Sequence, residues 1–391
     1  MKRILLVHPR FDVIGGAEMV ALHILNFLSH RINVEIFLLT LLPVDWKKIA
    51  RDTNIPICTD RVHNRTAFCP TFVLKQGGKL ELLKLAYLHR EAKRISSEFD
   101  ICVSTYNELD FGRKGFQYIH HPSFADRKLL NRFGMVGKRS IVDYLGVARR
   151  IYEKVRFTVA NERQEGFALN VTAVNSIFMR NVVQEAYGIE GIVLYPGFIP
   201  DGENDTGETW EQRSLRFVSI GRIARDKNYF NLIDTFGMLA RVFPEAKFTI
   251  IGKSGDPELL RDLWKRAMSH DLQLEILSDA NEALLFQILR TSKFYIHSKM
   301  YEHFGISILE AAGSGCLTFV HDSGGAREIV SPSMLRYITN EDLVRKVVQL
   351  SRDDESRTKV LNELQAGLSR FKARMFYVGL QKIFETNWDL L

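Results

Sequence analysis

The feature of this sequence that most constrains its fold is the alternation of short apolar runs with helical patterns through both halves of the chain. The apolar runs are rich in Val, Ile, Phe and Leu with little polar alternation, as strands buried on both faces require. We expect strands at Arg3–Val7, Val34–Leu39, Ile101–Ser104, Gln117–Ile119, Phe157–Ala160, Thr172–Asn175, Ile192–Tyr195, Phe217–Ile220, Lys247–Ile251, Leu274–Leu277, Phe294–His297 and Leu317–Val320. Helical patterns between them include Ala17–Leu28, Glu81–Ser96, Asn228–Arg241 and Pro257–Met268. This order predicts an α/β protein with parallel sheets flanked by helices.

The alternation pauses near mid-chain, where residues 200–208 are polar, contain two glycines and show no apolar period. A chain of 391 residues can hold two domains of ordinary size. We therefore expect one parallel-sheet domain over residues 1–199 and a second over 200–370, followed by a helix at 371–391 that packs back on the first domain. Two such domains predict a ligand-binding cleft at the carboxyl edges of their strands.

The composition, with 46% hydrophobic and 25% charged residues, is that of a soluble globular protein. The first apolar run is too short for the core of a signal peptide, and no run approaches the length of a membrane span. Four scattered cysteines are expected to be unpaired and to act as small buried hydrophobic groups, with a bridge between Cys58 and Cys69 as the alternative. We therefore expect a cytoplasmic protein.

The formal net charge is +7, and residues 127–156 alone carry a local excess of the same size. Apolar residues interleave with the cations there, which is typical of a segment that lies on an anionic membrane surface. A solvated helical face is the alternative interpretation. Nucleic acid is not expected as a partner, because no nucleic-acid-binding module accompanies the charge. Peripheral attachment to the cytoplasmic face of a membrane is therefore left open.

Paired glycines, Gly15 and Gly16, stand between the first expected strand and the first expected helix. Without side chains they let a phosphate approach the backbone N–H groups at the start of a helix. The glycine spacing of a dinucleotide-binding fingerprint is absent. A tight turn without a ligand is the alternative interpretation.

A second loop, residues 219–228, follows the first strand of the second half and reads Ser-Ile-Gly-Arg-Ile-Ala-Arg-Asp-Lys-Asn. Gly221 allows a sharp turn, after which Arg222 and Lys227 project from one loop. Two such cations can clamp a diphosphate, the Arg as a bidentate donor and the Lys as a point charge. Surface salt bridges are the alternative interpretation.

The most specific segment is 302–313, which begins with Glu302 and carries Glu310 eight residues later. On a single helix this spacing would not place the two carboxylates on one stripe. Because Gly305 intervenes, we expect Glu302 on a loop and Glu310 in the second turn of a helix that begins near Ile306. The N–H groups at that helix start would favour an anion. A ribose diol would satisfy Glu310, although an ordinary buried salt bridge would do so as well.

Glu302 and Glu310 match the Glu-x7-Glu signature of retaining glycosyltransferases of family 4, which have the GT-B fold of two Rossmann-like domains. Further segments that resemble this family, in the same order, are Gly15-Gly16, Asn175-Ser176, Leu194-Tyr195-Pro196 and the loop of residues 221–228. Residues 118–122, 302–306 and 321–325 are similar to the dolichol-pathway α-1,2-mannosyltransferases, which use GDP-mannose. This chain differs from them at the N-terminus, where they carry a longer membrane-anchoring segment.

The resemblance implies that residues 1–199 bind the acceptor and residues 200–370 bind the nucleotide sugar. It implies catalytic roles for Arg222 and Lys227 at the diphosphate and for Glu302 at the transferred sugar. His120 would touch the sugar or the acceptor, although a structural histidine is the alternative. The implied substrate-binding residues are Gly15, Gly16, Leu277 beside the base, Phe304, Gly305, Ile306, Ser307 and, at the ribose, Glu310.

The expected activity is a retaining hexosyl transfer, with GDP-mannose as the favoured donor and a lipid-linked or other glycan as acceptor. No cofactor is expected, and no metal, because the cationic loop can neutralise the leaving diphosphate. The alternatives are a GT-B epimerase, a phosphorylase and a non-catalytic scaffold with the same fold. A glycoside hydrolase is disfavoured, because Glu310 is expected on the nucleotide side.

Overall fold

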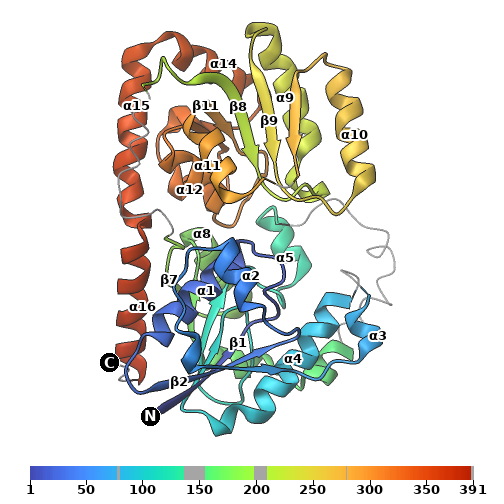
Figure 1. Ribbon diagram of the computed structural model, residues 1–391, viewed down its shortest axis with the longest axis vertical. Helices are drawn as coiled ribbons and strands as arrows, with labels where there is room; N and C mark the ends of the chain where they lie inside the picture. The colour runs from blue at the N-terminus through green and yellow to red at the C-terminus, as the bar shows by residue number, and fades with distance from the viewer. Residues whose placement is uncertain (77–79, 136–154, 198–208, 279, 389–391) are drawn as a thin grey trace. The chain divides into compact units, whose positions relative to one another are not determined.

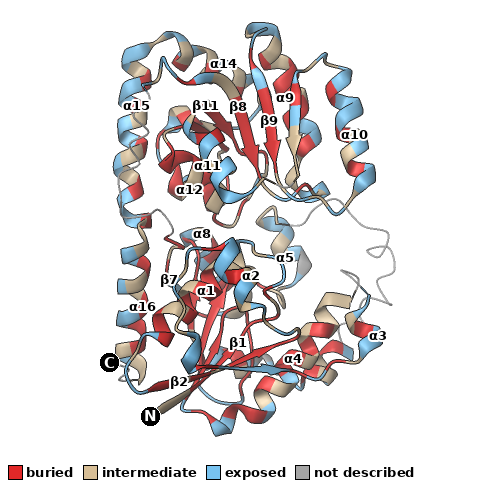
Figure 2. Ribbon diagram, viewed as in Figure 1, coloured by how far each residue is buried: buried red, intermediate tan, exposed pale blue. Residues whose placement is uncertain are grey.

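The computed structural model describes residues 1–76, 80–135, 155–197, 209–278 and 280–388. The chain forms two compact units, Met1–Tyr195 together with Phe376–Leu391, and Pro196–Met375 (Figure 1). The boundary expected at residues 199 and 200 lies outside the described residues, and the units divide between Tyr195 and Pro196. In both units the strands are largely buried, whereas many helices show one buried and one exposed side (Figure 2).

The sheet of the first unit is parallel throughout and its described strands run in the order β3-β2-β1-β4-β5-β6-β7. The strands are β1 (Lys2–Val7), β2 (Val34–Thr40), β3 (Val62–Thr66), β4 (Ile101–Ser104), β5 (Phe116–Ile119), β6 (Val171–Val174) and β7 (Ile192–Val193). The helices are α1 (Gly16–Ser29), α2 (Trp46–Asp52), α3 (Thr71–Leu74), α4 (Glu81–Ile95), α5 (Arg127–Arg132), α7 (Gln164–Ala168), α8 (Ile177–Tyr187) and α16 (Ala373–Trp388), with 3-10 turns at Thr59–Arg61 and Ser96–Glu98.

Helix α16 contributes its apolar stripe to the first unit. Phe376, Leu380, Ile383 and Phe384 are buried. The Phe384 ring lies 5.3 Å from that of Phe116 on β5 and 6.0 Å from that of Phe27 on α1. Burying such aromatic side chains is favourable by about 2 kcal/mol or more each, so α16 is part of this unit's core.

The second unit has a parallel sheet whose described strands run in the order β10-β9-β8-β11-β12-β13. The strands are β8 (Ser214–Ile220), β9 (Lys247–Ile251), β10 (Leu274–Leu277), β11 (Ser292–Ile296), β12 (Leu317–His321) and β13 (Arg336–Tyr337). The helices are α9 (Tyr229–Val242), α10 (Pro257–Met268), α11 (Glu282–Arg290), α12 (Ile306–Gly313), α13 (Ala326–Ile329), α14 (Asn340–Arg352) and α15 (Asp354–Gly367), with 3-10 turns at Arg225–Lys227, Ser333–Leu335 and Leu368–Phe371.

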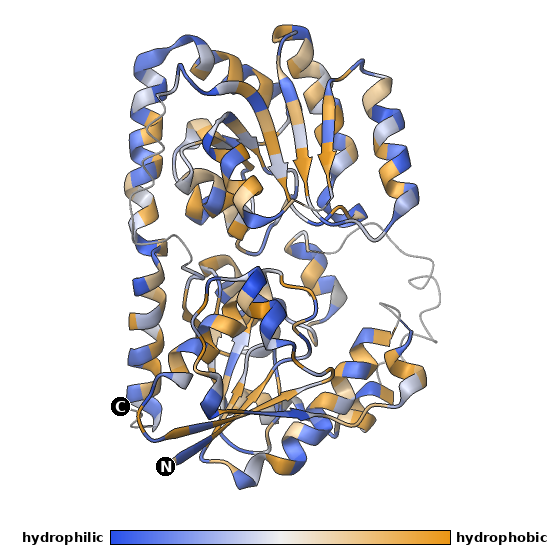
Figure 3. Cartoon of the chain, viewed as in Figure 1, coloured by the Kyte–Doolittle hydropathy of each residue, from blue (hydrophilic) through white to orange (hydrophobic). Residues whose placement is uncertain are grey.

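An aromatic ladder crosses the middle of this sheet. Phe217 on β8 stacks on Phe294 of β11 at 4.6 Å between ring centroids and on Phe248 of β9 at 5.4 Å. All three side chains are almost fully buried, and orange, hydrophobic segments stand beside polar ones along these strands (Figure 3). The ladder fixes the register of three neighbouring strands, and with it the positions of the loops that leave their carboxyl ends.

One expected strand is a helix. Phe157–Ala160 belongs to a helical stretch at residues 155–160. Arg156 and Ala160, four residues apart, are buried, whereas Val155 and Thr158 are exposed. This helical period was concealed because its first buried residue is an arginine, whose guanidinium group lies 4.0 Å from the ring centroid of Phe124.

Two strands were not expected. In β3 only Val62 is buried, because an edge strand can pair through its backbone without an apolar face. The two-residue strand β13 is too short to show any period.

Of the basic segment 127–156, residues 136–154 lie outside the described residues, so its proposed membrane contact stays a prediction. The four cysteines are free, as expected, and three of them are buried.

Gly252 directly follows β9, and its substitution tests how closely the ends of two strands approach. A Cβ atom at this position would lie 1.9 Å from the carbonyl oxygen of Gly221, the residue that follows β8. We expect Gly252→Ala to lower the free energy of unfolding by about 2 to 3 kcal/mol, because backbone must shift to admit the methyl group. Urea denaturation measures this loss. Gly255→Ala is the matched control, since nothing lies within 4 Å of its added Cβ; equal stability of both variants would contradict the expectation.

Candidate active site

The loops that leave neighbouring strands at the carboxyl edge of the second sheet carry most of the expected site residues. Strands β8, β11 and β12 are adjacent in the sheet and end at Ile220, Ile296 and His321. The loop after β8 contains Arg222 and Lys227, and the loop after β11 leads to Glu302 and helix α12. Parallel strands bring these loops to the same edge, so side chains 75 residues apart in sequence can meet there.

Lys227 and Glu302 form an ion pair at this edge. Lys227 Nζ lies 2.8 Å from Glu302 Oε2, and both side chains are largely buried. Lys299 Nζ lies 3.6 Å from Glu302 Oε1, which also accepts a hydrogen bond from the backbone N–H of His303 at 3.1 Å. Burial alone would raise the pKa of Glu302. The charges of Lys227 and Lys299 and a hydrogen bond from His297 outweigh it and hold that pKa well below its ordinary value.

The sequence did not predict this contact, since it assigned both residues to the ligand and not to each other. It also missed His297, which follows β11 directly and is 3% exposed. His297 Nε2 lies 3.1 Å from Glu302 Oε2. Burial lowers the pKa of His297 in spite of the neighbouring carboxylate, so the imidazole is neutral near pH 7. A histidine directly after a predicted buried strand was the available signal.

Helix α12 begins at Ile306, as expected, and places Glu310 in its second turn. Gly305 precedes the helix with φ of 104°, a conformation that favours glycine, and a Cβ there would also clash with the side chain of Ile308. Among the described residues no side chain or backbone group donates a hydrogen bond to the Glu310 carboxyl group. Burial, followed by repulsion from Glu282, raises the pKa of Glu310 to about 7. The carboxyl group is therefore available to a ligand.

Arg222 is exposed and lies beside Gly221, whereas Arg225 in the same loop pairs with Asp256 at 3.3 Å. Leu277 ends β10, and its carbonyl oxygen accepts a hydrogen bond from Gly252 N at 3.0 Å. Leu277 therefore lies at the same edge of the sheet as the loop that contains Gly221.

Phe304 is 3% exposed and packs on Phe371, whereas Ile306 and Ser307 are partly exposed. Phe304 therefore packs beneath the start of the helix, and its side chain is not exposed to a ligand.

In the first unit the expected site residues gather at the carboxyl edge of that unit's own sheet. Helix α1 begins at Gly16, and Gly15 N donates to Glu18 Oε2 at 2.9 Å. His120 follows β5, and its Nε2 lies 3.2 Å from the carbonyl oxygen of Thr105. Burial lowers the pKa of His120 to about 4, so the ring is neutral and Nε2–H donates this bond. In this tautomer Nδ1 carries a lone pair and is a hydrogen-bond acceptor.

His8 is a further member of this group that the sequence did not indicate. It follows β1 directly and is fully buried. Its Nδ1 lies 3.0 Å from Thr105 Oγ1, and its Nε2 lies 3.8 Å from Glu18 Oε1. The Gly15-Gly16 turn is thus held by Glu18, which in turn faces a buried histidine.

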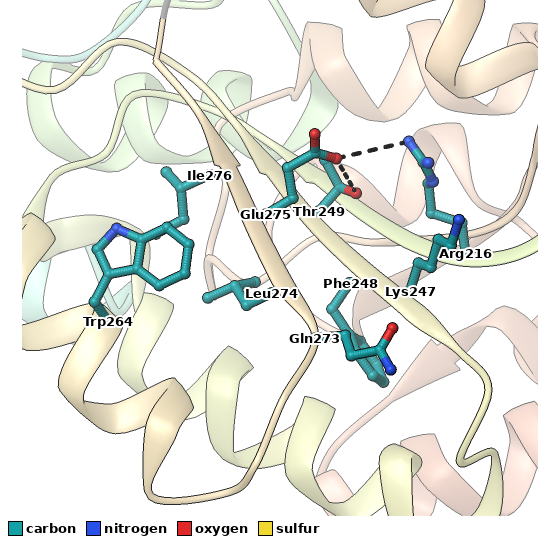
Figure 4. A pocket seen from close by; sticks show the side chains of 9 residues that line it. All are labelled: Arg216, Lys247, Phe248, Thr249, Trp264, Gln273, Leu274, Glu275 and Ile276. Atoms are coloured by element: carbon teal, nitrogen blue, oxygen red, sulfur yellow. Dashed lines mark hydrogen bonds and ion pairs between the residues drawn. The ribbon is translucent and has the colours of Figure 1, made fainter.

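A pocket of about 540 Å³ lies elsewhere in the second unit, at the first residues of its strands. It is lined by Arg216, Lys247, Phe248, Thr249, Trp264, Gln273, Leu274, Glu275 and Ile276. Glu275 contacts Arg216 at 3.9 Å and Thr249 at 3.4 Å (Figure 4). None of the expected site residues lines it, so the chemistry is assigned to the carboxyl edge. The described residues hold no cluster of three metal-binding side chains.

Two parallel-sheet units of this kind define a class, the GT-B fold. HepE of Anabaena, solved with UDP and glucose, superposes with a TM-score of 0.68 at 16% identity, covering 99% of this chain and 100% of that one. Sucrose-phosphate synthase of Thermosynechococcus elongatus gives 0.71 at 12% identity with full coverage of both chains. Residues 201–364 match the family model of glycosyl transferases group 1. The chain therefore has the GT-B fold, and its second unit is similar to group 1 glycosyltransferases.

Curated relatives are similar in sequence to part of this chain. Mannosylfructose-phosphate synthase of Agrobacterium fabrum is 33% identical over 172 residues, 39% of this chain and 37% of its own length. The human GDP-Man:Man(3)GlcNAc(2)-PP-Dol alpha-1,2-mannosyltransferase is 26% identical over 190 residues, 43% of this chain and 38% of its own length. These matches span less than two fifths of either relative. Within the residues described, no helix is long and apolar enough to cross a bilayer.

Proposed function

We propose that the protein transfers a hexose from a sugar nucleotide to a glycan with retention and without a metal ion. The observation that carries this proposal is the group formed by Lys227, Glu302 and the start of α12 at one edge of the second sheet. This group combines a cation, a helix N-terminus and an anchored carboxylate. Those are the groups that a departing diphosphate and a positively charged sugar require.

The leaving diphosphate gains negative charge as the glycosidic bond breaks. Lys227, with Arg222 from the same loop, neutralises this charge, and the first N–H groups of α12 face the same oxygens. Glu302 accepts hydrogen bonds from hydroxyl groups of the transferred sugar and stabilises its oxocarbenium character. Glu310 accepts hydrogen bonds from the ribose hydroxyls. With retention, the leaving phosphate oxygen takes the proton of the acceptor hydroxyl on the same face of the sugar.

GDP-mannose is the favoured donor, and a lipid-linked glycan at the cytoplasmic face of a membrane is the favoured acceptor. The support is the similarity to GDP-mannose-dependent mannosyltransferases from human, Dictyostelium discoideum, Caenorhabditis elegans and Neurospora crassa, at 22% to 26% identity. Other proteins similar to this chain carry UDP-linked donors in their names.

A donor screen tests this function. The melting temperature is measured with GDP-mannose, UDP-glucose, UDP-N-acetylglucosamine and ADP-glucose at 1 mM each, and we expect GDP-mannose to raise it most by mass action. Release of nucleoside diphosphate is then followed with a dolichol-linked oligosaccharide acceptor, with and without EDTA. Transfer that persists in EDTA, with an α-linked product, is the expected result. A product epimerised in the absence of acceptor, or no transfer from any donor, would contradict the proposal.

A further inference from the structure

A row of hydrogen bonds runs beside the Lys227–Glu302 pair, and His297 is the member of this row next to Glu302. On one side, His297 Nε2 lies 3.1 Å from Glu302 Oε2. On the other side, His297 Nδ1 lies 3.2 Å from the Tyr295 hydroxyl group, which also lies 3.0 Å from Ser307 Oγ in the first turn of α12. The row therefore links the carboxylate assigned to the sugar with the helix start assigned to the phosphates.

The partners of His297 define its tautomer. The Glu302 carboxylate is ionised and can only accept hydrogen bonds, so His297 Nε2 must carry a proton. The ring is neutral, so Nδ1 carries a lone pair, and it lies 3.2 Å from the Tyr295 hydroxyl group. That hydroxyl group also lies within hydrogen-bond distance of two other acceptors, Ser307 Oγ at 3.0 Å and the carbonyl oxygen of Ile220 at 3.4 Å. The bond from Nε2–H to Glu302 therefore sets the orientation of the imidazole ring, with Nδ1 on the side of Tyr295.

The backbone around His297 is held as well. Its carbonyl oxygen accepts a hydrogen bond from the Tyr337 hydroxyl group at 2.8 Å, and its N–H donates to the carbonyl oxygen of Phe319 at 2.9 Å. Both bonds reach across to the strands that continue the sheet beyond β11. His297 is thus fixed at backbone and side chain, and the position of its Nε2–H is set by the sheet.

Glu302 needs such a partner once a donor binds. In the structure its Oε2 is shared between Lys227 and His297, and Lys299 stands 3.6 Å from Oε1. A diphosphate attracts both lysine side chains and weakens their hold on the carboxylate. A neutral, buried imidazole is not attracted in the same way. Of the side-chain partners that the structure describes for Glu302, His297 is therefore the one that keeps its place when the donor arrives.

We propose that His297 is a positioning residue that holds Glu302 against the transferred sugar while Lys227 turns to the diphosphate. This inference rests on the function proposed above and adds a residue to it. His297 itself touches neither sugar nor phosphate. Its contribution is to keep the Glu302 carboxylate in the geometry that the transition state needs, where a misplacement of about 1 Å can cost a factor of about 100 in rate.

Steady-state kinetics with His297→Leu and His297→Gln tests the inference. In the leucine variant we expect kcat to fall by about 10- to 100-fold while KM for the donor stays within about threefold, because phosphate and ribose contacts are intact. Glutamine can place an amide N–H near the position of Nε2, so His297→Gln should recover kcat to within about fivefold of the wild type. His270→Leu is the matched control, because His270 pairs with Asp234 on α9, away from this row.

A spectroscopic readout separates the inference from the proposed function. In protein labelled with ¹⁵N-histidine, the ring signals lost in His297→Gln identify His297 among the 11 histidines. We expect them to show the neutral Nε2–H tautomer at pH 7 and above, and to change in Glu302→Gln. The Nδ1–H tautomer, or a folded His297→Leu variant with more than a third of wild-type kcat, would overturn the inference. A wild-type protein that turns over no donor would instead contradict the proposed function, and the spectrum would still decide the orientation of His297.

Discussion

Replacing Lys227 with alanine is expected to lower kcat by about 100- to 1000-fold, the effect of removing one preorganised charge from a developing anion. In the structure this ammonium group lies 2.8 Å from Glu302 in a largely buried position, so its charge is only weakly screened by water. The substitution also leaves Glu302 with less compensation for its own charge. We therefore expect weaker donor binding together with the slower chemical step. Nucleoside diphosphate release and the thermal shift induced by the donor measure the two effects separately.

The control for this experiment is Lys247→Ala, which removes an equal charge from the first residue of β9, at the opposite end of the strand from the site. It should transfer sugar at the wild-type rate. Arg222→Ala should lose activity too, since the exposed guanidinium is free to meet a diphosphate. A Lys227→Ala variant that keeps more than a tenth of wild-type kcat would show that the charge of Lys227 does not act on the leaving group. The assignment of the catalytic edge would then fail with it.

The two sheets could be predicted from the sequence because their strands are apolar on both faces. Runs such as Lys247–Ile251 leave no other interpretation, and β9 has the expected bounds. Prediction failed where burial did not follow hydrophobicity. The helical stretch at 155–160 buries an arginine against aromatic rings, and β3 pairs at an edge while exposing all but its first residue. Neither arrangement produces an apolar period, so only the tertiary structure reveals it.

The candidate site was predictable as a set of motifs but not as a set of contacts. The positions of Lys227, Glu302 and Glu310 follow from their order relative to strands and glycines. That Lys227 and Glu302 pair with each other depends on the adjacency of β8 and β11, which are not neighbours in sequence. His297 and His8 were missed because a single histidine after a strand is an ambiguous pattern. Their meaning comes from partners on other strands, Glu302 for one and Thr105 for the other.

Donor binding is expected to become about tenfold tighter between pH 6 and pH 8 because of Glu310. Burial and the nearby Glu282 raise its pKa to about 7, so the carboxyl group is mostly protonated at pH 6 and mostly ionised at pH 8. If only the carboxylate accepts hydrogen bonds from the ribose diol, the apparent dissociation constant scales with the fraction of protein in the ionised form. A sugar nucleotide is the right probe, because its diesterified diphosphate does not itself titrate in this range. Isothermal titration calorimetry at half-unit steps of pH gives the curve.

Two variants make this pH dependence specific to Glu310. Glu310→Gln should bind the donor weakly at every pH, with no slope between pH 6 and pH 8. Glu282→Gln removes the repulsion that contributes to the raised pKa of Glu310. It should move the midpoint of the affinity curve to lower pH and leave the dissociation constant at high pH unchanged.

The pH dependence of stability gives an independent check. The folded state holds the Glu310 proton more tightly than the unfolded state, so stability falls as pH rises from about 4.5 through 7, and Glu310→Gln should lack that part of the decline. A wild-type affinity that is flat or weakens with rising pH would mean that Glu310 does not bind the ribose as a carboxylate.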